Sequence, residues 1–347
     1  MKEIIEKAEQ SHNLTVPQIE KLLKFHCFDA DLFAAADRVR SQYKGDKIKI
    51  WGLFEFSNLC SNDCLYCGLR KSNSKIERYR ADKTDFLEMA HQARECGLKT
   101  LVLQSGEFNC NLTSRTEDNS GPYSFLKEIL PELRRLGFKV ILSCGNASRF
   151  DYRAFAKNGV KGYLMRIETT DKKLFNKMHP YQDWHTRDDQ LHIINNYGFY
   201  LATGNLVGLP GQSLQSIAKD LLYIKELSAE MIGIGGFIPH QETPLKDYPK
   251  ADVNLVLKCM AISRLLNPES DIVAATSLET LAPEAQKLGM ECGGNLVMTN
   301  VTAPWLRGKY EIFDGKSTAG ADLKNGLSEL TAKIESWGRV VSPVFEK

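Results

Sequence analysis

After residue 45 the sequence alternates short runs of β-forming residues with longer helical patterns, and this alternation constrains the fold most strongly. Helical stretches such as 83–96, 123–136 and 214–227 separate the runs. Eight strand–helix units predict a closed (β/α)8 TIM-type barrel of the α/β class rather than an open sheet. The expected strands are Lys47–Phe56, Thr100–Gln104, Lys139–Ser143, Gly162–Arg166, Tyr200–Val207, Met231–Phe237, Asp271–Ala275 and Gly294–Met298.

The segments before and after this region are expected to be mostly helical. Thr15 can cap a helix over Val16–Phe25, and a second helical pattern covers Asp29–Tyr43. We therefore divide the 347 residues into an N-terminal helical extension (1–45), a barrel (46–320) and a C-terminal helix and tail (321–347). A barrel of this size commonly forms one structural unit.

Charge and hydropathy argue against several classes of partner. The chain has 45 basic and 43 acidic side chains, a balance that favours neither a nucleic-acid nor a membrane partner. No apolar run approaches the roughly 20 residues of a membrane span, and the first residues lack the apolar core of a signal peptide. Nine cysteines without an export signal favour a reducing compartment, so we expect a cytoplasmic protein.

Three cysteines follow the first expected strand at C-x3-C-x2-C spacing, namely Cys60, Cys64 and Cys67. Three thiolates can hold three irons of a 4Fe–4S cubane and leave the fourth iron open for another ligand. A structural zinc site is the alternative, but zinc usually takes a fourth protein ligand, and no partner pair follows. The remaining cysteines show no ligand spacing and are expected mostly to be buried thiols: Cys27, Cys96, Cys110, Cys144, Cys259 and Cys292.

Polar segments follow other expected strands, at the end of a barrel where active sites lie. Gln104 and Glu107 in LQSGE could orient a bound ligand, or could belong to a solvated loop. Arg166 and Glu168 lie on one side of an extended chain. The Glu168 carboxylate suits a ribose diol, and the Arg166 guanidinium suits a carboxylate of a ligand. The alternative is that the two side chains form an internal ion pair.

Glycine-rich and apolar segments complete the expected site. TGNLVGLPGQS permits close backbone approach to a ligand. In GIGGFIPHQETPL the apolar surface around Ile238 could pack against an adenine, while His240 is expected to be a hydrogen-bonded loop residue. Met298 and Tyr310 fall at or just beyond the last strand, where they could close the pocket or belong to the core.

Together these motifs resemble the FeFe-hydrogenase maturase HydE family, within the biotin-synthase-like radical S-adenosylmethionine (SAM) enzymes. The likeness runs from about Lys47 to Phe313, and its most specific pieces are GLFEFSNLC–CLYCGLR, LQSGE, R-x-E-T, LVGLPGQ and GIGGFIPHQETPL. Methylornithine synthase and biotin synthase look like more distant relatives. The resemblance implies that the three cysteines bind the cluster, whose open iron chelates SAM for reductive cleavage to a 5′-deoxyadenosyl radical.

The resemblance also implies which side chains contact SAM. Glu168 would hold the ribose, Arg187 the carboxylate, and Met231 and Ile238 would flank the nucleoside. The role of Arg187 depends on the resemblance, since the sequence without it would favour a surface charge at this position. The full set of expected cofactor contacts is Tyr66, Gln104, Glu107, Arg166, Glu168, Arg187, Met231 and Ile238.

Several positions depart from the family pattern. Trp51 stands where the family has arginine, Ile141 where it has threonine and Ile167 where it has histidine, and the optional second-cluster cysteines are absent. Each lost charged hydrogen bond would cost about 1.5–3 kcal/mol, so the sequence predicts poor turnover of the HydE substrate. The expected substrate pocket comprises Trp51, Ile141, Thr276, Met298 and Tyr310.

Three functional hypotheses follow. The first is HydE-type maturation chemistry on a small precursor of the hydrogenase active site, using one 4Fe–4S cluster, SAM and an electron donor such as flavodoxin or ferredoxin. The second is a HydE-like enzyme that cleaves or rearranges C–S or C–C bonds of a less charged small molecule. The third is a non-catalytic iron–sulfur carrier, against which the SAM-binding pattern argues.

Overall fold

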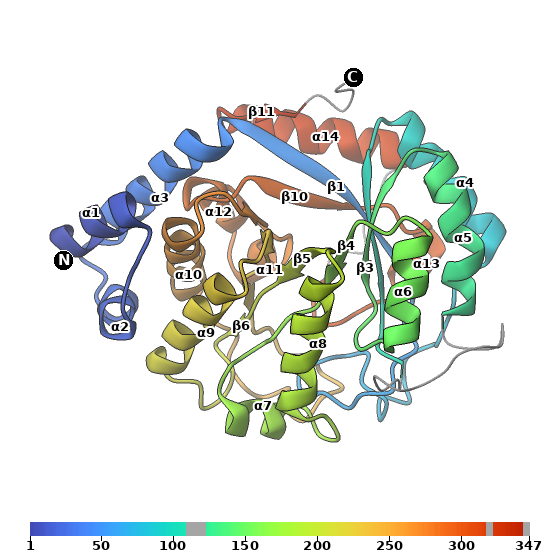
Figure 1. Ribbon diagram of the computed structural model, residues 1–347, viewed down its shortest axis with the longest axis horizontal. Helices are drawn as coiled ribbons and strands as arrows, with labels where there is room; N and C mark the ends of the chain where they lie inside the picture. Colours follow the sequence, from blue (N-terminus) through green and yellow to red (C-terminus); the bar gives the residue numbers. More distant parts are fainter. Residues whose placement is uncertain (109–122, 317–321, 343–347) are drawn as a thin grey trace.

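Eight parallel strands form the centre of the molecule in the computed structural model, which describes residues 1–108, 123–316 and 322–342 (Figure 1). They pair in the order β10-β1-β2-β3-β4-β5-β7-β9. A parallel bridge between Val273 and Leu296 then joins β9 to β10, which closes the ring and confirms the predicted barrel. The strands are β1 Lys47–Ser57, β2 Thr100–Ser105, β3 Lys139–Ser143, β4 Gly162–Leu164, β5 Tyr200–Thr203, β7 Met231–Ile232, β9 Asp271–Ile272 and β10 Leu296–Asn300.

Side chains alternate between the two faces of each strand. One face of β1 places Trp51 and Leu53 in the barrel interior, packed with residues such as Val102 and Ile141 from neighbouring strands. The opposite face places Phe54 in the core between the sheet and the outer helices. The barrel is therefore filled by side chains and is not an open tube.

Helices connect the strands and surround them (Figure 1). Polar side chains define several of their starts, as where Ser148 accepts the backbone N–H of Asp151 and Ser213 accepts that of Ser216. The helices are α4 Lys83–Glu95, α5 Ser124–Arg135, α6 Arg149–Lys157, α7 Lys172–Met178, α8 Trp184–Asn196, α9 Leu214–Glu226, α10 Val253–Leu266, α11 Ser277–Leu281, α12 Ala285–Glu291, α13 Pro304–Arg307 and α14 Leu323–Ser336.

Three helices precede the barrel and pack on its outside: α1 Lys2–Ser11, α2 Val16–Lys24 and α3 Asp29–Lys44. They contact α9 and α10, and they bury apolar side chains such as Ile19 and Leu32 against them. Thr15 lies at the N-cap of α2, as expected, and forms a capping box with Gln18. No helix within the described residues is long and apolar enough to cross a bilayer.

Two details of the sheet were not anticipated from the sequence. The expected strands over 200–207 and 231–237 each divide, and their second halves pair as a small parallel sheet of β6 Leu206–Val207 and β8 Gly235–Gly236. The C-terminal segment contains β11 Val340–Val341 after α14, and it pairs with Lys47–Ile48 at the start of β1. Residues 343–347, part of the expected tail, lie outside the described residues.

Candidate cluster and cofactor site

A cavity of about 260 Å³ lies at the carboxyl end of the barrel strands and collects most of the predicted site residues. The cysteine loop follows β1, the LQSGE turn follows β2 and the R-x-E-T segment follows β4, so three strands on one side of the barrel each carry one motif at their carboxyl end. The predicted residues that line it are Cys60, Cys64, Tyr66, Cys67, Gln104, Glu107, Arg166, Glu168, Arg187, Ile238 and Tyr310.

The cysteine loop is held by one arginine. The guanidinium of Arg78 donates hydrogen bonds of 2.7 to 3.2 Å to the backbone carbonyls of Asn58, Leu69, Arg70 and Asn73. These four carbonyls bracket the three cysteines on both sides. Arg78 therefore fixes the shape of the loop without contributing a ligand.

Replacing Arg78 with alanine should lower the iron retained per chain after anaerobic reconstitution. Hydrogen bonds to a charged group contribute roughly 1.5–3 kcal/mol each, and the substitution removes four. Iron and sulfide assays check this, with Arg80→Ala as the matched control because Arg80 is nearby and exposed. Full iron content in Arg78→Ala would show that the loop holds its shape without this residue.

The three cysteine sulfurs do not form a group of ligand atoms that all lie within 4.8 Å of one another. A tetrahedral zinc ion with Zn–S bonds near 2.3 Å requires sulfurs about 3.8 Å apart. Among the described residues, the only group of three or more possible ligands whose atoms all lie within 4.8 Å is His240, Glu311 and Asp314, which contains no cysteine. Three thiolates that each hold a different iron of a cluster do not need to converge on a single ion.

That other group does not suit a metal ion in this conformation. The backbone N–H of Glu242 donates to His240 Nδ1 at 3.0 Å, so the single proton of the ring sits on Nε2. A metal would need the lone pair of Nε2, which faces Glu311 and Asp314 at 3.8 and 3.9 Å. His240 is thus the hydrogen-bonded loop residue that the sequence suggests.

Burial sets the protonation of the three thiols. Loss of solvent raises the pKa of Cys60 and Cys64, and it raises the pKa of Cys67 to about 12. The neighbouring sulfurs add to the effect at Cys64 and Cys67. Metal binding requires thiolates. The positive charge of bound irons would stabilise the deprotonated sulfurs, which burial alone disfavours.

Glu168 is held in a strained backbone conformation that points toward a binding role. Its φ is +62°, in the left-handed region that residues other than glycine, asparagine and aspartate rarely adopt. Its Oε2 lies 3.0 Å from Arg166 Nη2 but accepts no well-aligned hydrogen bond among the described residues. Asn205 anchors Arg166 through its backbone carbonyl at 2.6 Å. The carboxylate therefore keeps acceptor capacity for a ligand.

Arg187 is buried beside this pair and is tied to three groups. Its Nη2 donates to Gln182 Oε1 at 2.8 Å and lies 3.2 Å from Glu107 Oε2, and its Nη1 donates to the Arg166 carbonyl at 2.8 Å. The nearby carboxylates of Glu107 and Glu168 keep the pKa of Arg187 raised against the lowering effect of burial. Its Nε has no acceptor among the described residues, which leaves one donor unused.

Two glycines allow the segments around the cavity to approach one another. A Cβ on Gly106 would lie 2.2 Å from the Leu59 carbonyl, so the LQSGE turn contacts the cysteine loop directly. Gly145, at φ +74°, leaves the space that the Glu107 side chain occupies. Side chains at these positions would push apart the loops that form the cavity.

His179 and Gln182 also line the cavity, and sequence reasoning missed both. His179 Nδ1 contacts the Phe175 carbonyl at 2.7 Å and must donate, so Nε2 accepts the Tyr66 hydroxyl at 2.8 Å. Burial lowers the pKa of His179 to about 3, which keeps the ring neutral. Gln182 Nε2 lies 3.5 Å from Cys64 Sγ. The only sequence signal was their position just after a predicted strand–helix unit.

Five predicted residues lie outside the cluster cavity. Met231 is buried in the barrel interior. Trp51 and Ile141 line a second cavity at the opposite end of the barrel. Thr276 and Met298 line a third cavity, of about 340 Å³, beside α14.

The free cysteines outside the loop are mixed in exposure. Cys27 is exposed and Cys96 is partly buried, while Cys144, Cys259 and Cys292 are fully buried as expected. Cys110 lies outside the described residues. None of the described ones lines the cluster cavity.

The chain matches two family models. Residues 54–224 match the radical SAM superfamily, and residues 234–327 match the biotin and thiamin synthesis associated domain. The first match covers the cysteine loop and the segments that follow β2, β4 and β5. The radical SAM superfamily uses a 4Fe–4S cluster and SAM, and the donors and acceptors left unused around Glu168 and Arg187 suit such a polar cofactor.

Individual relatives agree with these matches. The chain is 36% identical over 320 residues to the [FeFe] hydrogenase maturase subunit HydE of Thermotoga maritima, covering 91% of this chain and 88% of that protein. It is 25% identical to 3-methylornithine synthase of Methanosarcina acetivorans, covering 77% of this chain and 73% of that one.

Solved structures show the same fold. The crystal structure of methylornithine synthase (PylB) superimposes with a TM-score of 0.81 at 20% identity, covering 98% of both chains. The FeFe-hydrogenase maturase HydG from Carboxydothermus hydrogenoformans gives 0.79 at 19% identity, covering 98% of this chain and 78% of that one. From the identity to HydE and the superfamily match, the chain belongs to the HydE family of radical SAM enzymes.

Proposed function

We propose that this enzyme cleaves SAM reductively in the cluster cavity and directs the resulting radical at a small precursor in FeFe-hydrogenase cofactor maturation. The main support is the 36% identity to HydE over 91% of the chain. The gathering of the cysteine, LQSGE and R-x-E-T motifs around one cavity is consistent with it. The proposal includes a single 4Fe–4S cluster, because the described cysteines outside the loop line no part of that cavity.

Each side chain has a defined task in this proposal. Cys60, Cys64 and Cys67 would hold the cluster, which together with SAM supplies the radical chemistry when bound. The Tyr66 hydroxyl donates a hydrogen bond to His179, which holds the cysteine loop against the segment after α7.

The polar side chains around the cluster would then bind SAM. Glu168 would accept the ribose hydroxyls with its unused oxygen, and Arg187, supported by Glu107, would bind the carboxylate. Gln104 lines the same wall, and Ile238 offers an apolar surface for the base. Met231 is given no cofactor role because it lies in the barrel interior.

The substrate and reductant are proposed at a coarser level. The superfamily match and the likeness to HydE support a small-molecule substrate. We propose flavodoxin or ferredoxin as the electron donor, and the cytoplasm as the location. Neither choice affects the assignment of the cavity.

The positions of the three replaced residues do not support the expectation of poor turnover of the HydE substrate. Trp51 and Ile141 line the cavity at the other end of the barrel, and Ile167 is fully buried in the core between sheet and helices. None of the three replacements lines the cluster cavity. We therefore favour HydE-type chemistry over a recruited relative with a less charged substrate.

The wild-type chain should restore hydrogenase activity in a host that lacks its own HydE. Trp51→Arg should not improve this activity, since burying an unpaired guanidinium costs several kcal/mol and the residue is 8% exposed. Hydrogen evolution in the complemented host, with 5′-deoxyadenosine formation measured on the purified protein, checks both statements.

Three outcomes of this test would contradict the proposal. SAM cleavage without complementation by the wild-type chain would instead support a HydE-like enzyme with another substrate. Activity gained only in Trp51→Arg would show that this position controls the substrate. A cluster that assembles but never cleaves SAM would support a carrier.

A further inference from the structure

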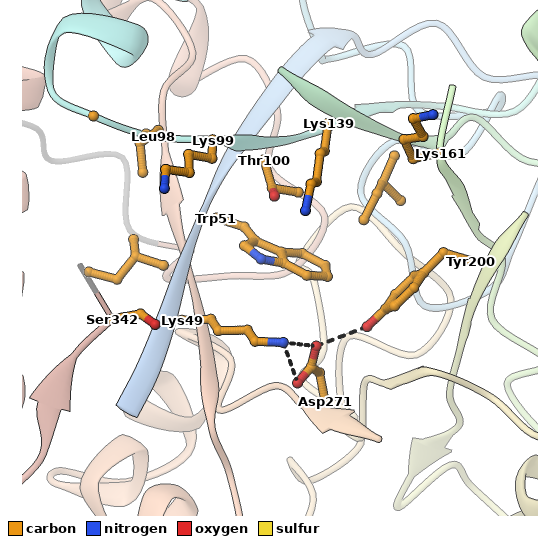
Figure 2. A pocket seen from close by; sticks show the side chains of 13 residues that line it. Lys49, Trp51, Leu98, Lys99, Thr100, Lys139, Lys161, Tyr200, Asp271 and Ser342 are labelled. Carbon is orange, nitrogen blue, oxygen red and sulfur yellow. Dashed lines mark hydrogen bonds and ion pairs between the residues drawn. The ribbon is translucent and has the colours of Figure 1, made fainter. Parts of the chain in front are cut away.

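A second cavity, of about 290 Å³, lies at the amino-terminal ends of the strands, opposite the cysteine loop (Figure 2). It shares no lining residue with the cluster cavity. Buried side chains of the barrel interior separate the two, among them Val102, Ala202 and Met231. A ligand in this basal cavity would therefore be distinct from SAM and from the substrate of the radical reaction.

The inner wall of the basal cavity is apolar and partly aromatic. Trp51 and Ile141 are 8% and 3% exposed and face the cavity from β1 and β3. The Tyr200 ring stands at 65° to the Trp51 ring, with their centroids 6.0 Å apart. Leu98 lines the same space. Figure 2 shows the broad indole of Trp51 at the centre of the group, where a flat or branched ligand body could rest against it.

Lysines from consecutive strands surround the entrance. Lys49 lies on β1, Lys99 directly precedes β2, Lys139 begins β3 and Lys161 directly precedes β4. Backbone hydrogen bonds link Lys139 to Lys99 and Tyr200 to Lys161, so these residues occupy one level of the barrel. Neighbouring strands are about 4.8 Å apart, so the four residues lie around one opening of the barrel. In Figure 2 the Lys139 ammonium points toward Trp51, while the Lys161 side chain lies at the far edge with its ammonium pointing away from Trp51.

Asp271 is the acidic residue that lines the cavity, and it is already neutralised. Its carboxylate lies 2.8 Å from Lys49 Nζ and 3.0 Å from Lys44 Nζ. It also accepts the Tyr200 hydroxyl at 3.0 Å and the Asn295 side-chain amide at 2.8 Å. These contacts, with Lys49 and Lys44 the main positive charges, hold the pKa of Asp271 below its ordinary value despite its burial.

The remaining lysines leave the entrance positively charged. Within the described part of the chain, Lys139 and Lys161 form no ion pair with a carboxylate. Glu230, which is near Tyr200, uses its side chain to accept the backbone N–H of Leu201 and does not line the cavity. A concave site lined by one sign of charge over a low-dielectric wall concentrates ions of the opposite sign.

We propose that the basal cavity binds a small organic anion, with its carboxylate at the Lys139 ammonium and its flat apolar body against Trp51. The cavity volume, at the lower end for small-molecule sites, limits the body to about the size of one ring with a short side chain. Both parts are needed, because the lysines supply the charge and the apolar wall supplies the burial. This proposal does not rest on the radical chemistry proposed above.

Calorimetric titration with 3-phenylpropionate tests the proposal, with the neutral 3-phenylpropanamide as the matched probe. The full-length wild-type protein should bind the anion saturably with a Kd of about 1 mM or lower, and the amide at least about tenfold more weakly. The double variant Lys139→Gln, Lys161→Gln should bind the anion at least about tenfold more weakly than wild type. Both lysines are exposed, so the double variant should fold, which circular dichroism checks. Lys219→Gln, an exposed change on α9, should bind like wild type.

Two results would overturn the proposal. One is the absence of saturable heat with wild type up to about 10 mM anion. The other is equal anion affinity in wild type and the double lysine variant, which would place the binding elsewhere on the protein. SAM binding should be unchanged in the double variant, so failure of this proposal is distinguishable from failure of the cluster assignment.

Discussion

Replacing Cys64 with alanine should leave a folded barrel that cannot retain a 4Fe–4S cluster or cleave SAM. Two thiolates cannot hold three irons, and the sulfur of Cys64 lies between those of its two partners in the loop sequence. We expect iron and sulfide per chain to fall far below wild type and 5′-deoxyadenosine formation to fall to background. Anaerobic reconstitution followed by iron, sulfide and nucleoside assays measures these quantities.

Cys96→Ala is the matched control for this experiment. Cys96 is partly buried at the end of α4 and does not line the cluster cavity, so its loss should leave iron content unchanged. Circular dichroism should show the same helical content in both variants. If Cys64→Ala kept its full iron content and SAM cleavage, the assignment of the loop would be wrong.

Replacing Arg187 with alanine should weaken SAM binding about ten- to a hundredfold while leaving the cluster assembled. The guanidinium is buried, and a charged hydrogen bond in such a site contributes roughly 1.5–3 kcal/mol, which converts to that range of affinity. Its removal also leaves Glu107 without its cationic partner at 3.2 Å, and that carboxylate would repel the SAM carboxylate. Equilibrium binding of SAM to the reconstituted protein checks the prediction.

Glu168→Gln provides an independent measurement on the same ligand. It removes the charge but keeps the shape, so a ribose contact predicts weaker SAM binding with normal iron content. Arg149→Ala, an exposed change at the start of α6, should bind SAM like wild type. Unchanged SAM affinity in both Arg187→Ala and Glu168→Gln would show that the cofactor lies elsewhere in the cavity.

The barrel and the cysteine loop could be predicted because their signals are local. Each strand is a short β-rich run with a helical pattern after it, and every expected strand overlaps an observed one, although those over 200–207 and 231–237 divide and several others differ at their ends. The spacing of Cys60, Cys64 and Cys67 is also local, since one loop carries all three. Parallel strands then bring the ends of β1, β2 and β4 together, which explains why Glu107 and Glu168 share a cavity.

The height of a residue along the barrel could not be predicted from alternation alone. Trp51 and Ile141 do face inward, as the alternation indicates. At about 3.3 Å per residue, however, Trp51 lies about 20 Å along β1 from Ser57, where β1 ends beside the cluster cavity. Met231 likewise faces inward, at the start of β7. A residue reaches the cluster cavity only if it lies at the carboxyl end of its strand or in the loop that follows.

Contacts between distant segments were also beyond sequence reasoning. The hydrogen bond from Tyr66 to His179 joins residues more than a hundred positions apart, and neither belongs to a pair with a recognisable spacing. The pairing of β11 with β1 is set by where α14 ends, and its two residues carry no distinctive strand pattern. Such contacts depend on packing of the complete chain.

The most direct test is SAM cleavage by the reconstituted, reduced wild-type protein, with 5′-deoxyadenosine quantified by mass spectrometry. Electron paramagnetic resonance spectra of the reduced cluster are recorded with and without SAM in the same samples. We predict that SAM changes the cluster spectrum and that 5′-deoxyadenosine forms only when cluster, SAM and reductant are all present. A fully assembled cluster whose spectrum does not change on addition of SAM, and that yields no 5′-deoxyadenosine, would contradict the assignment of this cavity.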